Sequence, residues 1–96
     1  MKFLIIEKTK STPVEVWAKL LPAHFKYLDN LQKQGKIEVS YHLIGEQGDV
    51  LIVNADSDEE LSKIIGEDPL FFHNRRKIYP LTTREVHKKR LEQIIK

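Results

Sequence analysis

The sequence contains no cysteine, and only four of its 96 residues are glycine, four are proline and one is methionine. Without cysteine, disulfides, thiolate nucleophiles and thiolate metal ligands are excluded. The apolar run near the N-terminus, FLII, is too short for a signal peptide or a membrane span. We therefore expect a single cytoplasmic domain, residues 1–96, with no membrane partner.

A strong excess of charge of one sign is also missing. Sixteen Lys and Arg residues balance fourteen Asp and Glu residues, so the formal net charge is only +2. Binding to nucleic acid depends on dense positive charge, and we expect no such partner here. The segment 82–96 is locally basic, but it lacks the interleaved aromatic residues that stack on bases. The overall composition is that of a soluble globular domain.

Four apolar or alternating segments predict β-strands, at residues 2–8, 37–44, 50–55 and 72–81. In the second of these, Ile37, Val39 and Tyr41 are expected on one face. Ser40 and His42 then lie in a polar row on the other face. GEQGD, residues 45–49, predicts the turn of a hairpin between the second and third strands.

Capping boxes, in which Ser or Thr precedes Glu by three residues, mark three helix starts at Thr12, Ser57 and Thr82. Gly35 and Gly66 are placed to end the first two helices, and the third runs to about residue 95. Pro22 interrupts the first helix, where it removes a backbone hydrogen bond. It predicts a kink or a break near residues 18–22.

The resulting order, β-α-β-β-α-β with a C-terminal helix at 83–96, predicts an α+β fold of the ferredoxin-like type. FLII and VLIV are apolar on both faces, yet two helices cover only one face of such a sheet. We therefore expect a homodimer that pairs two sheets face to face. The C-terminal helix has an apolar side and is expected to pack on its own or a neighbouring subunit.

The most informative pattern is a stripe in the first helix, Trp17, Leu21, His24, Leu28 and Leu31, at steps of four, three, four and three. This spacing places all five side chains on one helix face, directed toward a core or a pocket. His24 is then either a hydrogen-bonded core residue or the reactive group of a site. The stripe alone leaves both interpretations open.

Three segments, LPAHFKYLDNLQKQGKI, LIGEQGDVLIV and DPLFFHNRRKIYPL, resemble the muconolactone isomerase-like family of dimeric α/β barrels. The resemblance covers about residues 3–86 and extends to YCII-related proteins. It implies a ferredoxin-like subunit, a homodimer or larger ring, and chemistry without a metal or organic cofactor.

The implied chemistry is a proton shift in a small unsaturated lactone or carbonyl acid. Such a shift needs a base beside a carbonyl and donors for the enolate oxygen. His24 suits the base, because an unperturbed histidine has a pKa of about 6.5. The YCII-like resemblance suggests that Asp68 orients His24. Alternatively, Asp68 only forms the turn before Pro69.

Three further residues are candidate substrate ligands. His42 either lines a cavity or meets solvent, and Tyr27 either donates to an oxyanion or packs its ring. Arg76 could hold a substrate carboxylate in a bidentate fork, or it could be a solvated strand charge. The four histidines show no i, i+4 pair, so we expect no metal site.

Two function classes follow. One is a cofactor-independent isomerase that acts on a small-molecule ligand. The other is a YCII-like or non-catalytic dimeric module for small-molecule binding or interaction.

Overall fold

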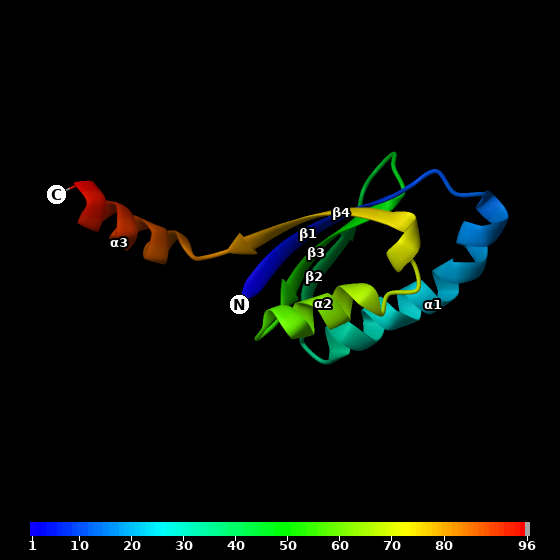
Figure 1. Ribbon diagram of the computed structural model, residues 1–96, viewed down its shortest axis with the longest axis horizontal. Helices are drawn as coiled ribbons and strands as arrows, with labels where there is room; N and C mark the ends of the chain where they lie inside the picture. The colour runs from blue at the N-terminus through cyan, green and yellow to red at the C-terminus, as the bar shows by residue number, and fades with distance from the viewer. Residues whose placement is uncertain (96) are drawn as a thin grey trace.

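The computed structural model describes residues 1–95 and has the β-α-β-β-α-β order followed by a C-terminal helix (Figure 1). This confirms the predicted fold class. The elements are β1 (Lys2–Thr9), α1 (Val14–Lys33), β2 (Ile37–His42), β3 (Gly48–Asn54), α2 (Asp58–Gly66), β4 (Asn74–Leu81) and α3 (Arg84–Ile95). A short 3-10 helix, Phe71–His73, occupies what we expected to be the start of the last strand.

The sheet has the order β2-β3-β1-β4, and all neighbouring strands are antiparallel. Helices α1 and α2 cover one face (Figure 1). On that face Ile5 of β1 and Val53 of β3 are fully buried and pack with Leu31 of α1 and Ile64 of α2. The apolar core is therefore a layer between the sheet and the two helices.

One of the three predicted capping boxes forms as expected. The Ser57 hydroxyl accepts a hydrogen bond of 3.1 Å from the Glu60 backbone N–H at the start of α2. At α1 the Thr12 hydroxyl donates to the Lys10 carbonyl instead, and Pro13 takes the N-cap position. At α3 it is Thr83, one residue after the predicted cap, whose hydroxyl accepts from the backbone. The capping predictions at Thr12 and Thr82 are therefore wrong.

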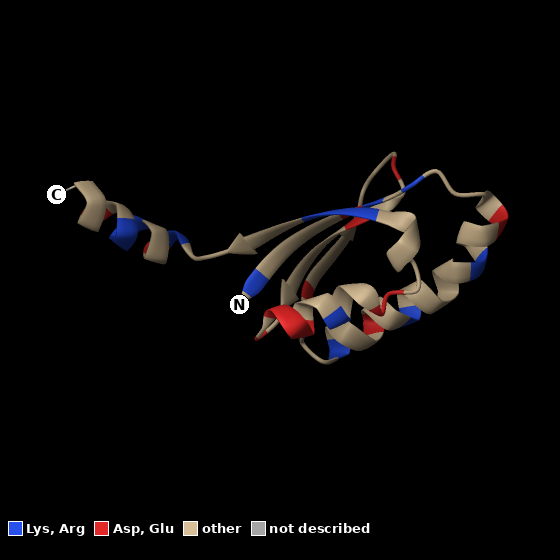
Figure 2. Ribbon diagram, viewed as in Figure 1, with Lys and Arg blue, Asp and Glu red and all other residues tan. Residues whose placement is uncertain are grey.

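A kink or a break was predicted near residues 18–22, and the break does not occur, because the first helix continues through Pro22 as one element. Pro22 and Ala18 are both exposed. The carbonyl that lacks its helical N–H partner can be hydrated there, which lowers the cost of the proline. Figure 2 shows an acidic cluster at the start of α2, where negative charge complements the helix dipole.

The register of β2 differs from a simple alternation. Ile37 pairs with Val53, but Val39 pairs with Ile52, so a β-bulge lies between Ile37 and Val39. The extra residue turns Ile37 and Val39 to opposite faces, and our prediction that they share a face is wrong. The bulge leaves Ser40 on the helix-covered face, opposite Leu51. His42 lies on the same face.

The second face of the sheet carries half-buried apolar side chains, with Tyr41 and Tyr79 exposed beside them. These half-buried residues are Leu4, Ile6, Val39, Val50 and Ile52. We call this set the open face, because within residues 1–95 no helix lies over it (Figure 1).

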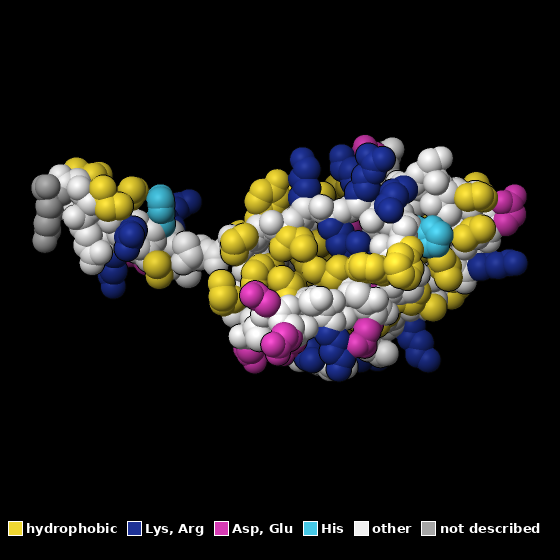
Figure 3. All heavy atoms as spheres, in the orientation of Figure 1, with side chains coloured by type: hydrophobic (Ala, Val, Ile, Leu, Met, Phe, Trp, Pro, Cys, Tyr) yellow, Lys and Arg dark blue, Asp and Glu magenta, His cyan; other side chains and the backbone are white. Residues whose placement is uncertain are grey.

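Helix α3 extends away from the rest of the molecule (Figure 1). All of its residues are exposed, so it does not pack on its own subunit. Figure 3 shows hydrophobic and basic side chains together on this helix. The same view shows an apolar band between α2 and β4, where a shallow groove is lined by Leu61, Ile65, Phe71 and Ile78. Part of the apolar surface of the molecule is therefore not covered by any of its described helices or strands.

Candidate functional site

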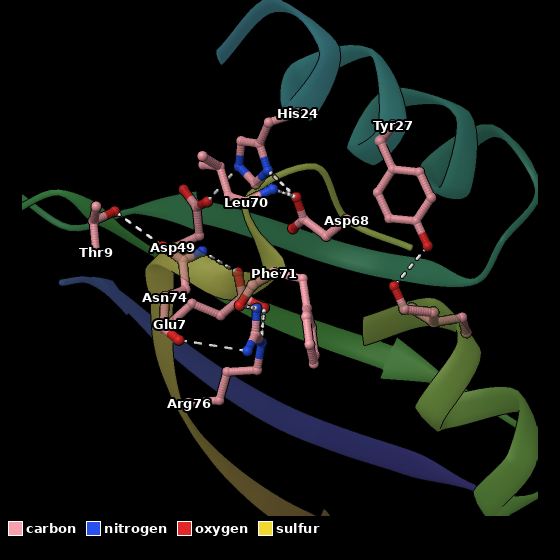
Figure 4. A network of polar contacts seen from close by, with 11 residues as sticks. Glu7, Thr9, His24, Tyr27, Asp49, Asp68, Leu70, Phe71, Asn74 and Arg76 are labelled. Carbon is pink, nitrogen blue, oxygen red and sulfur yellow. Dashed lines mark hydrogen bonds and ion pairs between the residues drawn. The ribbon is translucent and has the colours of Figure 1, made fainter. Parts of the chain in front are cut away.

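The site is built around His24, whose imidazole is clamped between two carboxylates (Figure 4). Its Nδ1 lies 2.8 Å from Oδ1 of Asp68, and its Nε2 lies 3.0 Å from Oδ2 of Asp49. His24 is only 1% exposed. The stripe on α1 thus points toward the sheet, as its spacing predicted, and the histidine in that stripe is fully hydrogen-bonded.

Asp68 reaches His24 from the loop after α2. The same Oδ1 atom accepts a hydrogen bond of 2.8 Å from the Leu70 backbone N–H. Asp68 therefore both shapes the turn around Pro69 and holds His24, so the two roles considered for it coexist. The hydrogen bond within the turn therefore holds the Asp68 carboxylate in the orientation that it needs to bond the imidazole.

Asp49 reaches His24 from the start of β3, on the other side of the ring. The preceding residue, Gly48, faces the backbone of β1, and a Cβ there would lie 2.2 Å from the Glu7 carbonyl oxygen. Only glycine permits this close approach. The glycine thereby lets β3 start beside β1, which places Asp49 under α1.

Charge in this cluster depends on the hydrogen bonds to the imidazole. Burial alone would lower the pKa of His24, but the hydrogen bonds to Asp49 and Asp68 outweigh it and raise the pKa to about 9. Burial would raise the pKa of Asp49, yet its hydrogen bonds with His24 and His42 hold that pKa below the usual range. At neutral pH His24 is therefore an imidazolium. The unperturbed pKa of about 6.5, on which the suitability of His24 as a base was argued, therefore does not apply in this environment.

His42 extends the cluster to the surface. Its Nδ1 lies 3.3 Å from Oδ1 of Asp49, and its side chain is 58% exposed. A continuous chain of polar contacts therefore runs from His42 through Asp49 and His24 to Asp68. This chain connects solvent to a buried carboxylate.

A cavity of about 370 Å³ lies beside this chain. One wall is the apolar side of α1, with Trp17, Leu21, Phe25 and Leu28. The remaining lining residues are His24, Asp29, Gln32, Thr9, Ser40, His42, Gln47, Gly48, Asp49, Leu70 and Asn74. Its size is within the range of small-molecule sites. Predicted candidates His24 and His42 thus meet in one pocket.

The other two predicted ligands, Tyr27 and Arg76, are engaged elsewhere (Figure 4). The Tyr27 hydroxyl donates to the Ile64 carbonyl at 2.6 Å, and burial raises its pKa to about 12. Arg76 Nε donates to Glu7 Oε1 at 3.1 Å, and Nη2 donates to the Phe71 carbonyl at 3.0 Å. Neither residue lines the cavity of His24. Both hold neighbouring elements together.

Asp49 is the residue that sequence reasoning missed. Its only sequence signal is an acidic residue that follows a glycine and precedes an apolar strand. The predicted turn included it among the loop residues. The structure pairs it with His42 across the β2–β3 hairpin, on the face that points to α1.

Within residues 1–95, no group of three or more His, Asp or Glu side chains is arranged to hold a metal ion. In the same part of the chain, none of the helices combines the length and the apolar character needed to cross a bilayer.

Comparison with protein families places the fold in a known group. The family model described as muconolactone delta-isomerase matches residues 1–87. The chain belongs to the muconolactone delta-isomerase family. No curated protein sequence matches it.

Two solved structures share the fold of this family member. A crystal structure of muconolactone isomerase is 17% identical, with a TM-score of 0.80, and the match covers 88% of this chain and 91% of that one. The 5-chloro-2-hydroxyhydroquinone dehydrochlorinase TftG of Burkholderia phenoliruptrix, in complex with 2,5-dihydroxybenzoquinone, is 23% identical, with a TM-score of 0.73. That match covers 90% of this chain and 98% of that chain. At these identities the likeness establishes the fold.

Proposed function

We propose that this family member is a cofactor-independent enzyme that shifts a proton within a small unsaturated lactone or a related carbonyl compound. The observation that carries the proposal is the position of the His24 ring, which is fixed between Asp49 and Asp68 at the wall of the cavity. Titratable groups with shifted pKa values in a pocket are typical of reactive sites. Membership of the isomerase family supports the same reaction class.

In the proposed reaction Asp49 is the base, because it lines the cavity while His24 is already protonated. The Asp49 carboxylate takes a proton from a carbon beside the carbonyl, and the electron pair moves to the carbonyl oxygen. This leaves an enolate beside the protonated Asp49 carboxyl group, and the same carboxyl group then returns the proton to another carbon of the enolate. Double bond and proton change places, and no electrons are gained or lost.

His24 and Asp68 act through Asp49 in this scheme. The imidazolium donates to Asp49 through Nε2 and keeps the carboxylate ionised and oriented. Asp68 holds the opposite nitrogen, so the ring cannot rotate away. Ser40 and Gln47 line the same cavity and carry donors that suit a developing enolate oxygen.

The test is a turnover screen with small unsaturated lactones on the wild type and on Asp49→Asn. We expect the variant to lose activity by roughly a hundredfold or more, because the amide cannot accept the proton. Asp56→Asn makes the same chemical change at an exposed loop position and should leave the rate unchanged. In the wild type, activity should fall as pH rises through about 9, where His24 loses its charge. Full activity of Asp49→Asn would remove the proposed base.

A second candidate function is a non-catalytic small-molecule-binding module. It is favoured by one observation, that both ring nitrogens of His24 are already hydrogen-bonded, as in a structural histidine. Saturable ligand binding in the cavity with no turnover of any lactone in the screen would support this candidate over the enzyme.

We also propose that the chain forms a homodimer through the open face, with α3 packing on the neighbouring subunit. The open face is an apolar sheet surface of a kind that monomers rarely leave exposed. Helix α3 carries exposed Val86, Leu91, Ile94 and Ile95 and lies away from its own sheet. Two uncovered apolar surfaces on one small chain favour self-association as the way to bury them.

Deleting residues 83–96 should therefore weaken the assembly. Sedimentation velocity at micromolar concentration should give a dimer or larger species for the full chain, and fewer subunits per assembly for the truncated chain. As a control, the triple change Arg84→Gln, Lys88→Gln and Lys89→Gln keeps the apolar side of α3 and should retain the assembly. A full chain that sediments as a monomer would contradict the dimer. An unchanged number of subunits after truncation would exclude α3 from the contact.

A further inference from the structure

The cavity beside His24 has an uneven distribution of charge. Among the described residues that line it, none is Lys or Arg, whereas Asp29 and Asp49 both contribute carboxylates. The one buried cation, His24, is bonded on both sides to carboxylates and has no nitrogen left for a ligand anion. The residues around the cavity thus offer more negative than positive charge.

A ligand carboxylate in this cavity would face the negative charges of the lining residues and, among the residues described, would find no cationic group to bind it. Proteins usually bind a carboxylate with an Arg fork, a Lys or free backbone N–H groups. Arg76, the arginine predicted to form such a fork, is bonded to Glu7 and to the Phe71 carbonyl instead. His42 at the rim is bonded to Asp49. A carboxylate would therefore lose its hydration and gain repulsion from Asp29 and Asp49.

The same cavity is well suited to an uncharged ring. Trp17, Leu21 and Leu28 of α1 form an apolar wall, and Leu70 adds to it from the loop before β4. Opposite groups such as Ser40 and Gln47 offer hydroxyl and amide partners for a neutral oxygen atom. A concave pocket lined by apolar side chains with a few polar groups is typical of small-molecule sites.

We propose that the cavity selects uncharged cyclic compounds that carry hydroxyl or carbonyl oxygens, and discriminates against compounds that carry a carboxylate. This inference shares one assumption with the proposed function, namely that the substrate binds in this cavity. It narrows the substrate class to the neutral lactone or ring ketone, and it disfavours the carbonyl acid.

The test is direct binding of two matched probes, 3-hydroxybenzamide and 3-hydroxybenzoate, to the full chain. The probes have the same ring and nearly the same shape, and they differ in charge. Chemical-shift titration at neutral pH should give an affinity for the amide that is roughly tenfold or more above that for the benzoate. The shifted resonances should include the indole N–H of Trp17, the single tryptophan, which lines the cavity.

The second part of the test reverses the charge of one residue that lines the cavity. Asp29 is exposed on α1, so Asp29→Lys should fold normally. This variant should raise the affinity for 3-hydroxybenzoate several-fold relative to the affinity for 3-hydroxybenzamide. Equal or tighter binding of the benzoate to the wild type would overturn the proposal, and so would the absence of saturable amide binding at millimolar concentration. Because binding is measured without turnover, these outcomes are independent of whether Asp49→Asn abolishes the reaction.

Discussion

Replacing Arg76 by Met is expected to lower the free energy of unfolding by about 3–5 kcal/mol at neutral pH, because it leaves a buried carboxylate without its cation. Glu7 is 2% exposed, and its Oε1 accepts from Arg76 Nε at 3.1 Å. The guanidinium also donates to the Phe71 carbonyl and lies 4.7 Å from the centre of the Phe71 ring. Only the hydrogen bond from Asn74 to Glu7 would remain for this carboxylate.

The loss should depend on pH with a definite sign. Burial and the nearby Asp68 raise the pKa of Glu7 above 4.5, while Arg76 opposes both. A carboxyl group with a raised folded pKa costs stability as pH rises above its unfolded pKa, because folding then opposes ionisation. Without Arg76 the pKa of Glu7 rises further. The deficit of the variant is thus largest at neutral pH and shrinks as the solution is acidified toward pH 4.5.

Urea unfolding followed by Trp17 fluorescence, at equal chain concentration for all variants, measures this effect. Arg75→Met is the matched control, because Arg75 is exposed on the neighbouring position of β4. Its effect should stay within about 0.5 kcal/mol. Adding Glu7→Gln to Arg76→Met should recover part of the loss, since the unpaired charge is then gone. Equal midpoints for the Arg76 and Arg75 variants would show that the buried pair contributes nothing.

The fold could be predicted mainly from the local pattern of apolar and polar residues along the sequence. The apolar runs of β1 and β3 and the helical stripe of α1 identify the elements, because periodicity records which faces are buried. The capping box at Ser57 is also correct. At α1 the same motif fails, because Pro13 occupies the N-cap position. A capping motif marks the neighbourhood of a helix start, and the backbone geometry selects the residue.

The position of a site residue could be predicted only where the periodicity of a single helix or strand determines it. The inward position of His24 follows from helical spacing, whereas its contact with Asp68 was suggested by the resemblance to YCII-related proteins. Asp49 was missed because its role depends on the hairpin and on the glycine before it. Arg76 and Tyr27 were predicted to lie in the pocket because their side chains are of a chemical type that can bind a substrate carboxylate or an oxyanion. Their partners, Glu7 and Ile64, are 69 and 37 residues away along the chain, and periodicity does not encode such pairings.

Replacing His24 by Leu is expected to destabilise the protein by about 3–5 kcal/mol at neutral pH, because the imidazolium is the charge that separates two carboxylates. Asp68 is almost completely buried, and Asp49 is mostly so. Adding Asp68→Asn should recover part of the stability, since the amide keeps the oxygen that accepts from the Leu70 backbone N–H. His87→Leu removes a histidine from exposed α3 and serves as the control.

The pH dependence identifies the charge on His24 as the cause. The folded pKa is raised from 6.5 to about 9, so the ion pairs contribute stability that is complete below pH 6.5 and lost as pH rises through 9. The size of this shift corresponds to roughly 3 kcal/mol. In urea titrations the difference between the wild type and His24→Leu should therefore shrink by about that amount between pH 6.5 and pH 10. A difference that stays constant over this interval would mean that His24 is neutral in the folded protein, as a packing residue, and would remove the charged partner on which Asp49 depends.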